Sequence, residues 1–131
     1  MQEQEKVQQV PVKMYRTPDR LMVAAPMPGM EPCDVLVQVE QANRLIIRGK
    51  VRALLKNTKE LLMDEWSVGI YYRELTLPNA VDGANANVTY GNGVLVVALP
   101  ISERTTPATL TMDKTATAHG DHVGNAGHPV A

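Results

Sequence analysis

Asn92-Gly93-Val94-Leu95-Val96-Val97-Ala98-Leu99-Pro100 is the stretch that decides the fold. Asn-Gly is the strongest short signal for a two-residue hairpin turn. The residues between Gly93 and Pro100 are all apolar, and proline is excluded from the middle of a sheet. A short apolar run that is rich in valine and bounded by turn residues is typical of a buried strand. We therefore expect a central strand over residues 94–99 that is covered on both faces by two layers.

Alternating apolar and polar residues predict further strands before this one. The clearest is at residues 34–40, where Val35, Val37 and Val39 share one face. Shorter patterns predict strands at residues 10–15, 21–25, 44–48, 71–77 and 87–90. Many short strands separated by turns are typical of a sandwich, so the predicted fold class is all-β, an immunoglobulin-like antiparallel β-sandwich.

One segment disagrees with this pattern. Residues 51–63 carry apolar side chains at helical spacing, with lysine, arginine and glutamate between them. Taken alone, this pattern predicts an amphipathic helix. A helix therefore stays open for this segment at this point.

Composition limits the classes of function. The 131 residues include 13 basic and 14 acidic side chains, for a formal net charge of −1, so no nucleic acid or membrane partner is expected. The single cysteine, Cys33, cannot form an intrachain disulfide and is expected to be an inert turn thiol in a reducing compartment. With a polar start and no apolar run of membrane-spanning length, the expected location is cytoplasmic.

The ends of the chain differ in composition from its middle. Residues 1–9 are rich in glutamine and glutamate and predict a short polar arm, while residues 102–131 predict a flexible C-terminal extension. The sandwich domain is then expected at residues 10–101. His119, His122 and His128 lie in the extension without cysteines or a convergent set of carboxylates, so no metal site is expected.

Three separated blocks resemble the small heat-shock protein family, over roughly residues 10–100. They are residues 25–34 (APMPGMEPCD), 65–78 (EWSVGIYYRELTLP) and 92–100 (NGVLVVALP). The motif positions in these blocks are Pro28, Gly29, Gly69, Pro78, Asn92, Gly93, Val94 and Leu95. The resemblance implies an α-crystallin-type sandwich. It also implies an ATP-independent molecular chaperone, a holdase that binds non-native client proteins.

The ends of the chain depart from the family pattern. Family members commonly have a long apolar N-terminal arm, and an Ile-x-Ile/Val motif in the C-terminal extension that enters an apolar groove on a neighbour. Here the arm is short and polar, and Leu110-Thr-Met112 is the candidate for C-terminal anchoring. The resemblance therefore implies a homodimer or a small oligomer rather than a large shell.

The resemblance also implies a dimer interface. In bacterial and plant relatives the region of residues 51–63 is a long loop whose short strand pairs with a partner's sheet edge. Leu61, Leu62, Met63 and Glu65 stand at that position, and we favour this loop over the helix. Arg73 would pair with acidic groups across the dimer, and the alternative is a solvated strand arginine.

A second candidate site is a groove for a client or a tail. Leu36 points away from the valine face of its strand, and Val88 and Tyr90 are expected nearby. An open sheet edge at this position would accept an extended peptide by strand addition. The alternative is that these residues belong to the sandwich core.

Patterns typical of enzymes are absent from the sequence. Ser67 and Ser102 do not stand in a Gly-x-Ser-x-Gly turn, and Gly91-Asn-Gly93 leads into a strand rather than a helix. We therefore expect neither catalysis nor a cofactor. The alternative to a holdase is a CS-domain-like adaptor or co-chaperone, which would be a monomer that binds a specific folded partner.

Overall fold

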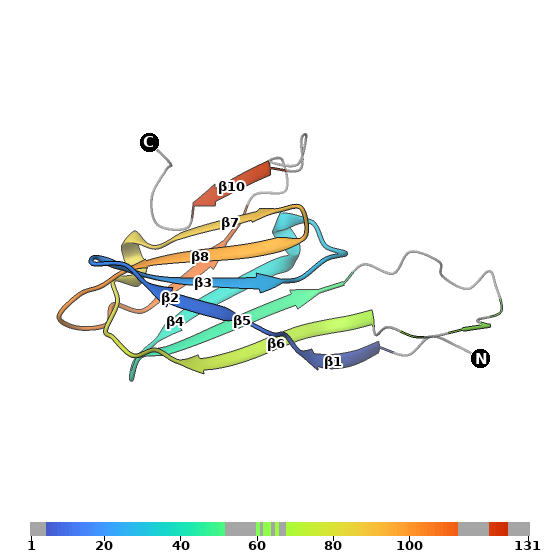
Figure 1. Cartoon of the computed structure of the whole chain (residues 1–131), viewed down its shortest axis with the longest axis horizontal. Helices are drawn as coiled ribbons and strands as arrows, with labels where there is room; N and C mark the ends of the chain where they lie inside the picture. The colour runs from blue at the N-terminus through green and yellow to red at the C-terminus, as the bar shows by residue number, and fades with distance from the viewer. Residues whose placement is uncertain are drawn as a thin grey trace.

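Two five-stranded sheets pack face to face in the computed structural model, which describes residues 5–51, 60, 62–63, 65, 68–112 and 121–125 (Figure 1). The first, here called the β4 sheet, has the order β1-β6-β5-β4-β9. Its strands are β1 (Glu5–Gln9), β6 (Val68–Thr76), β5 (Arg44–Lys50), β4 (Val35–Glu40) and β9 (Ala108–Thr111).

The second sheet, here called the β8 sheet, has the order β10-β7-β8-β3-β2. Its strands are β10 (Asp121–Asn125), β7 (Asn87–Gly91), β8 (Val94–Pro100), β3 (Arg20–Pro26) and β2 (Lys13–Arg16). Two short 3-10 turns, η1 (Pro32–Asp34) and η2 (Gly83–Asn85), precede β4 and β7. All strand pairs are antiparallel except β1 and β6, which run parallel. The predicted all-β sandwich is confirmed.

Alternation along the strands builds the core as predicted. Val35, Val37 and Val39 point inward from β4 and are no more than 2% exposed. Leu95, Val97 and Leu99 point inward from β8 and are fully buried. Successive side chains of a strand face opposite sides of its sheet. The inward valines of β4 and the inward Leu95, Val97 and Leu99 of β8 therefore belong to one hydrophobic core between the sheets.

The Asn92-Gly93 turn joins β7 to β8 as predicted. Both residues have positive φ, 53° at Asn92 and 78° at Gly93, which is the backbone that a tight hairpin turn requires. The Gly93 carbonyl accepts a hydrogen bond from the Met27 amide at 2.7 Å. A Cβ on Gly93 would lie 3.3 Å from the Cβ of Pro28, so the first and third sequence blocks meet at this turn.

Two tyrosines hold the Met27–Pro28 backbone that packs against this turn. The Tyr71 hydroxyl donates to the Pro28 carbonyl at 3.1 Å, and the Tyr90 hydroxyl donates to the Met27 carbonyl at 2.6 Å. Burial raises the pKa of both hydroxyls above the ordinary tyrosine value. The three blocks therefore converge on one corner of the sandwich, which explains why they stand so far apart in the sequence.

The β8 strand differs from prediction on one face. It lies centrally in its sheet, between β7 and β3, but it was expected to be covered on both faces. Val94 is 39% exposed, and Val96 and Ala98 are half-buried. The strand alternates like any other, so these three side chains point outward even though they are apolar.

The ends of the chain contribute strands that composition did not predict. The expected arm contains β1, which pairs with β6, and the expected flexible extension contains β9 and β10, which pair with β4 and β7 (Figure 1). A sheet border presents unpaired amides and carbonyls, which any extended backbone can satisfy. The expected limits at residues 10 and 101 therefore leave out three strands.

The segment at residues 51–63 falls mostly outside the described residues. Its described members, at positions 51, 60, 62 and 63, belong to no helix or strand. Of the three histidines, His119 and His128 are outside as well. Within the described part of the chain, no helix is long and apolar enough to cross a membrane, and no three metal-ligating side chains cluster.

Candidate functional site

The border of the sandwich between β4 and β7 is covered by the chain's own strand β9. Strand β9 pairs antiparallel with β4, with Leu110 opposite Val37 and Thr111 opposite Leu36. The same strand also contacts β7 in the other sheet. It therefore extends the β4 sheet at the border where the sequence predicted an open groove, and this border between β4 and β7 is here called the β4–β7 groove.

Two apolar side chains of this segment reach the core. Leu110 is 1% exposed and Met112 is 6% exposed, whereas Thr111 between them faces solvent. Both belong to the core cluster. Fully burying one such side chain contributes roughly 1.5–3 kcal/mol. The border thus binds an extended segment that carries two apolar residues separated by one polar residue.

The predicted groove residues lie on two different faces. Val88 and Tyr90 point inward from β7, are 1% and 5% exposed, and share the core cluster with Leu110. Leu36 neighbours the inward-pointing Val37 and therefore faces the outside of the β4 sheet, opposite Arg48 of β5. The structure brings Val88 and Tyr90 together with the tail and does not bring Leu36 to them.

Strand β10 was not expected at the site. It pairs with β7, with Val123 opposite Thr89, so each side of the groove carries a C-terminal strand. For β9, the alternation of Leu110 and Met112 is a signal that could have predicted a strand. For β10, Asp121-His122-Val123-Gly124-Asn125 offers no apolar alternation, so sequence reasoning had nothing to detect.

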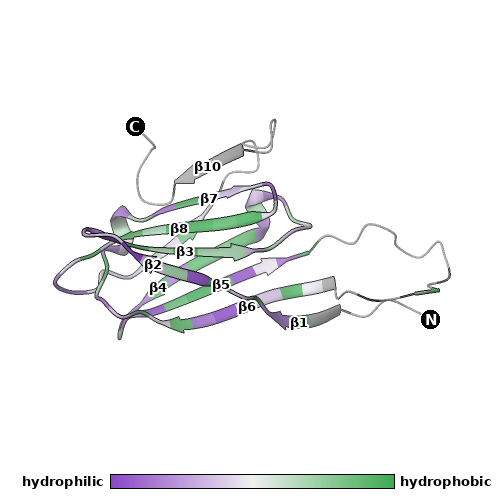
Figure 2. Cartoon of the chain, in the orientation of Figure 1, coloured by the Kyte–Doolittle hydropathy of each residue, from purple (hydrophilic) through white to green (hydrophobic). Residues whose placement is uncertain are grey.

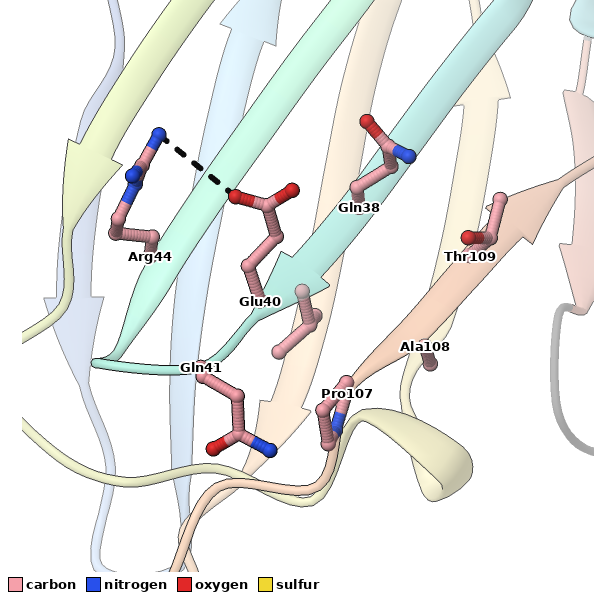
Figure 3. A pocket seen from close by; sticks show the side chains of 8 residues that line it. Gln38, Glu40, Gln41, Arg44, Pro107, Ala108 and Thr109 are labelled. Carbon is pink, nitrogen blue, oxygen red and sulfur yellow. Dashed lines mark ion pairs between the residues drawn. The ribbon is translucent and has the colours of Figure 1, made fainter.

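An open hollow lies at one end of the β4–β9 border (Figure 3). Gln38, Glu40, Arg44 and Thr109 line it together with three apolar residues and Gln41. Arg44 pairs with Glu40 at 3.7 Å and also with Glu74 on β6. One guanidinium thus bridges two carboxylates at a solvent-facing rim, which is an arrangement typical of an exposed protein surface.

Arg73 binds the segment in which the chain passes from one sheet to the other. It points inward from β6, is half-buried, and donates from Nη1 to the Val10 carbonyl at 3.0 Å. Val10 lies between β1 in one sheet and β2 in the other, and its amide donates to the Tyr72 carbonyl at 3.3 Å. The buried Nε of Arg73 has no hydrogen-bond partner among the described residues. One donor of this guanidinium is therefore left for a further acceptor.

The predicted interface segment presents two apolar side chains to solvent. Leu62 is 85% exposed and Met63 is 73% exposed, and Glu65 is also exposed. Leu61 lies outside the described residues. Strand β2 is the outermost strand of the β8 sheet, and Tyr15 on it is 49% exposed. Adjacent exposed apolar residues and an outermost strand are features of an interaction surface.

Comparison with known proteins places this geometry in a family. The family model described as "Hsp20/alpha crystallin family" matches residues 13–112. A "Probable 15 kDa heat shock protein" from Leptospira interrogans is 37% identical over 90 residues, which cover 68% of this chain and 67% of that protein. The "18 kDa antigen 1" of Mycobacterium avium is 31% identical over 98 residues, which cover 75% of this chain and 65% of that protein. The chain thus spans about two thirds of the length of these relatives.

A solved structure gives the same result. The small heat-shock protein from Xylella fastidiosa, whose title reports a distinct high order structure, aligns with a TM-score of 0.61 and 26% identity. The alignment covers 75% of this chain and 90% of that one. The two-sheet sandwich, the three converging blocks and these matches agree, and the chain belongs to the Hsp20/alpha crystallin family of small heat-shock proteins.

Proposed function

We propose that this protein is an ATP-independent holdase, which binds segments of unfolding proteins and prevents their aggregation without catalysis. Membership of a chaperone family supports the coarser part of this proposal. We further infer a cytoplasmic location, because Cys33 is a free, exposed thiol and such thiols persist in reducing compartments.

One observation carries the proposal. The β4 border accepts an extended segment through backbone pairing and takes Leu110 and Met112 into the core. Backbone pairing does not depend on the sequence of the added strand, and the two apolar positions require only side chains of suitable size. Unfolding proteins expose extended apolar segments of this kind. The groove can therefore take a client strand in place of β9.

Competition with β9 makes client capture conditional. A segment tethered to its own groove acts at an effective concentration of the order of millimolar. A client therefore has to be abundant, or β9 has to detach, before the groove is occupied. Heating favours both, since it unfolds clients and releases short edge strands. Binding non-native chains then lowers their free concentration by mass action, with no nucleotide involved.

We also propose that the working unit is a homodimer or a small oligomer. The exposed pair Leu62–Met63 would add to the outermost strand β2 of a second copy, and the unpaired Nε–H of Arg73 would donate to a carboxylate across that interface. Within the described part of one chain, the Leu62–Met63 pair is largely exposed and the Arg73 Nε has no hydrogen-bond partner. A second copy would supply contacts for both.

Light scattering of an aggregating client tests the holdase proposal. Chemically reduced insulin serves as the client, and the chaperone is added at equimolar ratio with and without ATP. We expect strong suppression of scattering in both conditions and a dimer or small oligomer by analytical ultracentrifugation. A monomer that leaves scattering unchanged would instead favour an adaptor of the CS-domain type, and suppression only with ATP would also contradict the proposal.

A further inference from the structure

The side chain of Met30 fills a notch in the β4 sheet that a glycine creates. A Cβ added to Gly49 would lie 2.4 Å from the Met30 Sδ and 2.7 Å from the Met27 Cε, which is closer than a real Cβ atom approaches its neighbours. Gly49 is buried in β5, between Val35 of β4 and Tyr71 of β6. The thioether of Met30 therefore occupies the space that any other residue at position 49 would need for its own side chain.

Met30 differs from the other methionines of the described residues. Met27 and Met112 are buried, and Met63 is 73% exposed. Met14 and Met30 are both half-buried and pack against the core. The backbone of Met14 is held within β2 by its pairing with β3, whereas Met30 belongs to no strand. Met30 thus combines contact with the core, a place at the surface and a backbone outside the two sheets.

The segment that carries Met30 leads into the groove-forming strand. Residues 27–34 end with η1, and η1 is followed directly by β4 at Val35. Val35 pairs with Gly49, and the next residue, Leu36, pairs with Thr111 of β9. A displacement of this segment therefore acts where β4 begins and where the end of β9 is paired.

The surroundings of the notch are apolar or already hydrogen-bonded. The hydroxyls of Tyr71 and Tyr90 donate to the carbonyls of Pro28 and Met27. Strand β8 begins at the same corner, next to Pro28, and is hydrophobic along most of its length (Figure 2). A new polar oxygen in the notch would meet two hydroxyl donors that are already engaged. Burying it there would therefore cost free energy.

We propose that Met30 is an oxidation site, at which hydrogen peroxide converts the thioether to a sulfoxide. One peroxide oxygen forms a bond to Sδ, the O–O bond breaks, and the second oxygen leaves as water. The sulfur loses the two electrons that the peroxide gains. Oxidation makes an apolar methionine polar and disrupts the packing around it. The sulfoxide leaves the notch over Gly49, and residues 27–34 move away from the corner and loosen the pairing of β4 with β9.

Peroxide treatment of the full chain, followed by peptide mass spectrometry, tests the site. The gain of one oxygen atom is measured at each methionine over time. We expect the exposed Met63 to react first, and Met30 to react initially about tenfold faster than Met27, because reaction at the buried Met27 requires local opening of the corner. Equal initial rates at Met30 and Met27 would overturn the proposed site.

Amide exchange with deuterium measures the structural consequence. Met30→Leu keeps an apolar side chain of similar size that peroxide does not oxidise, and Met14→Leu is the control at the other half-buried methionine of the core. After peroxide, the β4 amides should exchange about tenfold faster in the unmodified chain and in Met14→Leu, and at an unchanged rate in Met30→Leu. Methionine sulfoxide reductase with dithiothreitol should restore slow exchange.

A second variant keeps the test decisive if Met30→Leu does not fold. Met30→Gln places a polar side chain of similar length in the notch, so its β4 amides should exchange fast without any peroxide. Slow exchange in Met30→Gln would contradict the proposal. Equal acceleration by peroxide in Met30→Leu and in the unmodified chain would assign the effect to another methionine and overturn it. The holdase proposal stands apart, because the scattering assay of untreated protein decides it.

Discussion

The guanidinium of Arg73 makes one hydrogen bond within its own chain and has a second N–H donor without a partner in the described residues. Its Nη1 holds the Val10 carbonyl, and its buried Nε has no partner in the described part of the structure. The sequence predicted a role between subunits, which stays a prediction. It did not predict the contact with Val10, because a strand pattern does not reveal which distant backbone group a long side chain reaches.

Substitution of Arg73 should affect two properties at once. Arg73→Ala removes the hydrogen bond to Val10 and leaves that carbonyl unpaired, which should lower the free energy of unfolding by about 1–3 kcal/mol. If a partner carboxylate is buried against Nε, dimerisation should weaken by about 2–5 kcal/mol. Urea unfolding and analytical ultracentrifugation measure the two effects. Arg48→Ala removes an exposed arginine of the same sheet and is the control. An unchanged dimer affinity in Arg73→Ala would contradict the interface role.

Tyr71 and Tyr90 make stability depend on alkaline pH. Burial raises the pKa of both hydroxyls in the folded protein, so the folded state holds their protons more tightly than the unfolded state. Their contribution to stability is complete below the unfolded pKa of about 10 and is lost as the pH rises through the folded values.

The matching experiment compares urea midpoints at neutral and alkaline pH. The double variant Tyr71→Phe, Tyr90→Phe should be less stable at neutral pH by about 1–3 kcal/mol, because two hydrogen bonds to the Met27–Pro28 backbone are lost. Its further loss of stability above about pH 10 should be smaller than that of the unmodified protein. The exposed Tyr15→Phe is the control. If stability falls equally above about pH 10 in the unmodified protein, the double variant and Tyr15→Phe, then Tyr71 and Tyr90 do not link stability to pH.

At the scale of the strand, the sequence predicted the elements that build the core. Strand β4 and its buried valines follow directly from alternation, and the β7–β8 hairpin follows from Asn92-Gly93. Strands β1, β9 and β10 were not predicted, because pairing at a sheet border depends on which edges the rest of the fold leaves open. The short polar segments of β1 and β10 carry no record of that in their own periodicity, whereas β9 has a signal in the alternation of Leu110 and Met112.

Strand β9 should be separable from the sandwich. The double variant Leu110→Ser, Met112→Ser removes both apolar groups from the groove and keeps the backbone able to pair. We expect the amides of β4 to exchange with deuterium faster, while those of β8 stay protected, since β8 is bonded on both sides by β7 and β3. The paired control Thr109→Ser, Thr111→Ser changes exposed positions of the same strand. Faster exchange throughout both sheets would mean that β9 belongs to the global folding unit and is not a detachable strand.

At the scale of the whole molecule, the sandwich has borders of two kinds. The β4 and β7 borders carry strands of the same chain, whereas β2 ends its sheet with no further strand in the described residues. Opposite faces differ as well, because the outward positions of β5 include Arg44, Arg48 and Lys50, whereas those of β8 are Val94, Val96 and Ala98. The sequence predicted a groove for a client or a tail and named Leu110-Thr-Met112 as the segment that would anchor in the groove of a neighbour. It did not predict that this segment pairs with β4 of its own chain, since that border exists only after both sheets are assembled.

The proposed dimer depends on the exposed pair Leu62–Met63. Replacing both with serine should shift the protein from dimer towards monomer in analytical ultracentrifugation while the circular dichroism spectrum stays that of a folded sandwich, because the pair contributes little to the core of its own chain. Val7→Ser, at another exposed apolar position, is the control. A dimer of unchanged affinity would show that subunits associate through a different surface.

Occupation of the β4–β7 groove by an extended apolar segment is the central claim, and one competition measures it most directly. The Leu110→Ser, Met112→Ser variant is assayed for suppression of insulin scattering, alone and with a synthetic peptide of residues 107–112. We predict protection at least as strong as that of the unmodified chain, and its reduction as the peptide fills the emptied groove. Protection that is unaffected by a peptide shown to slow amide exchange in β4 would contradict the claim.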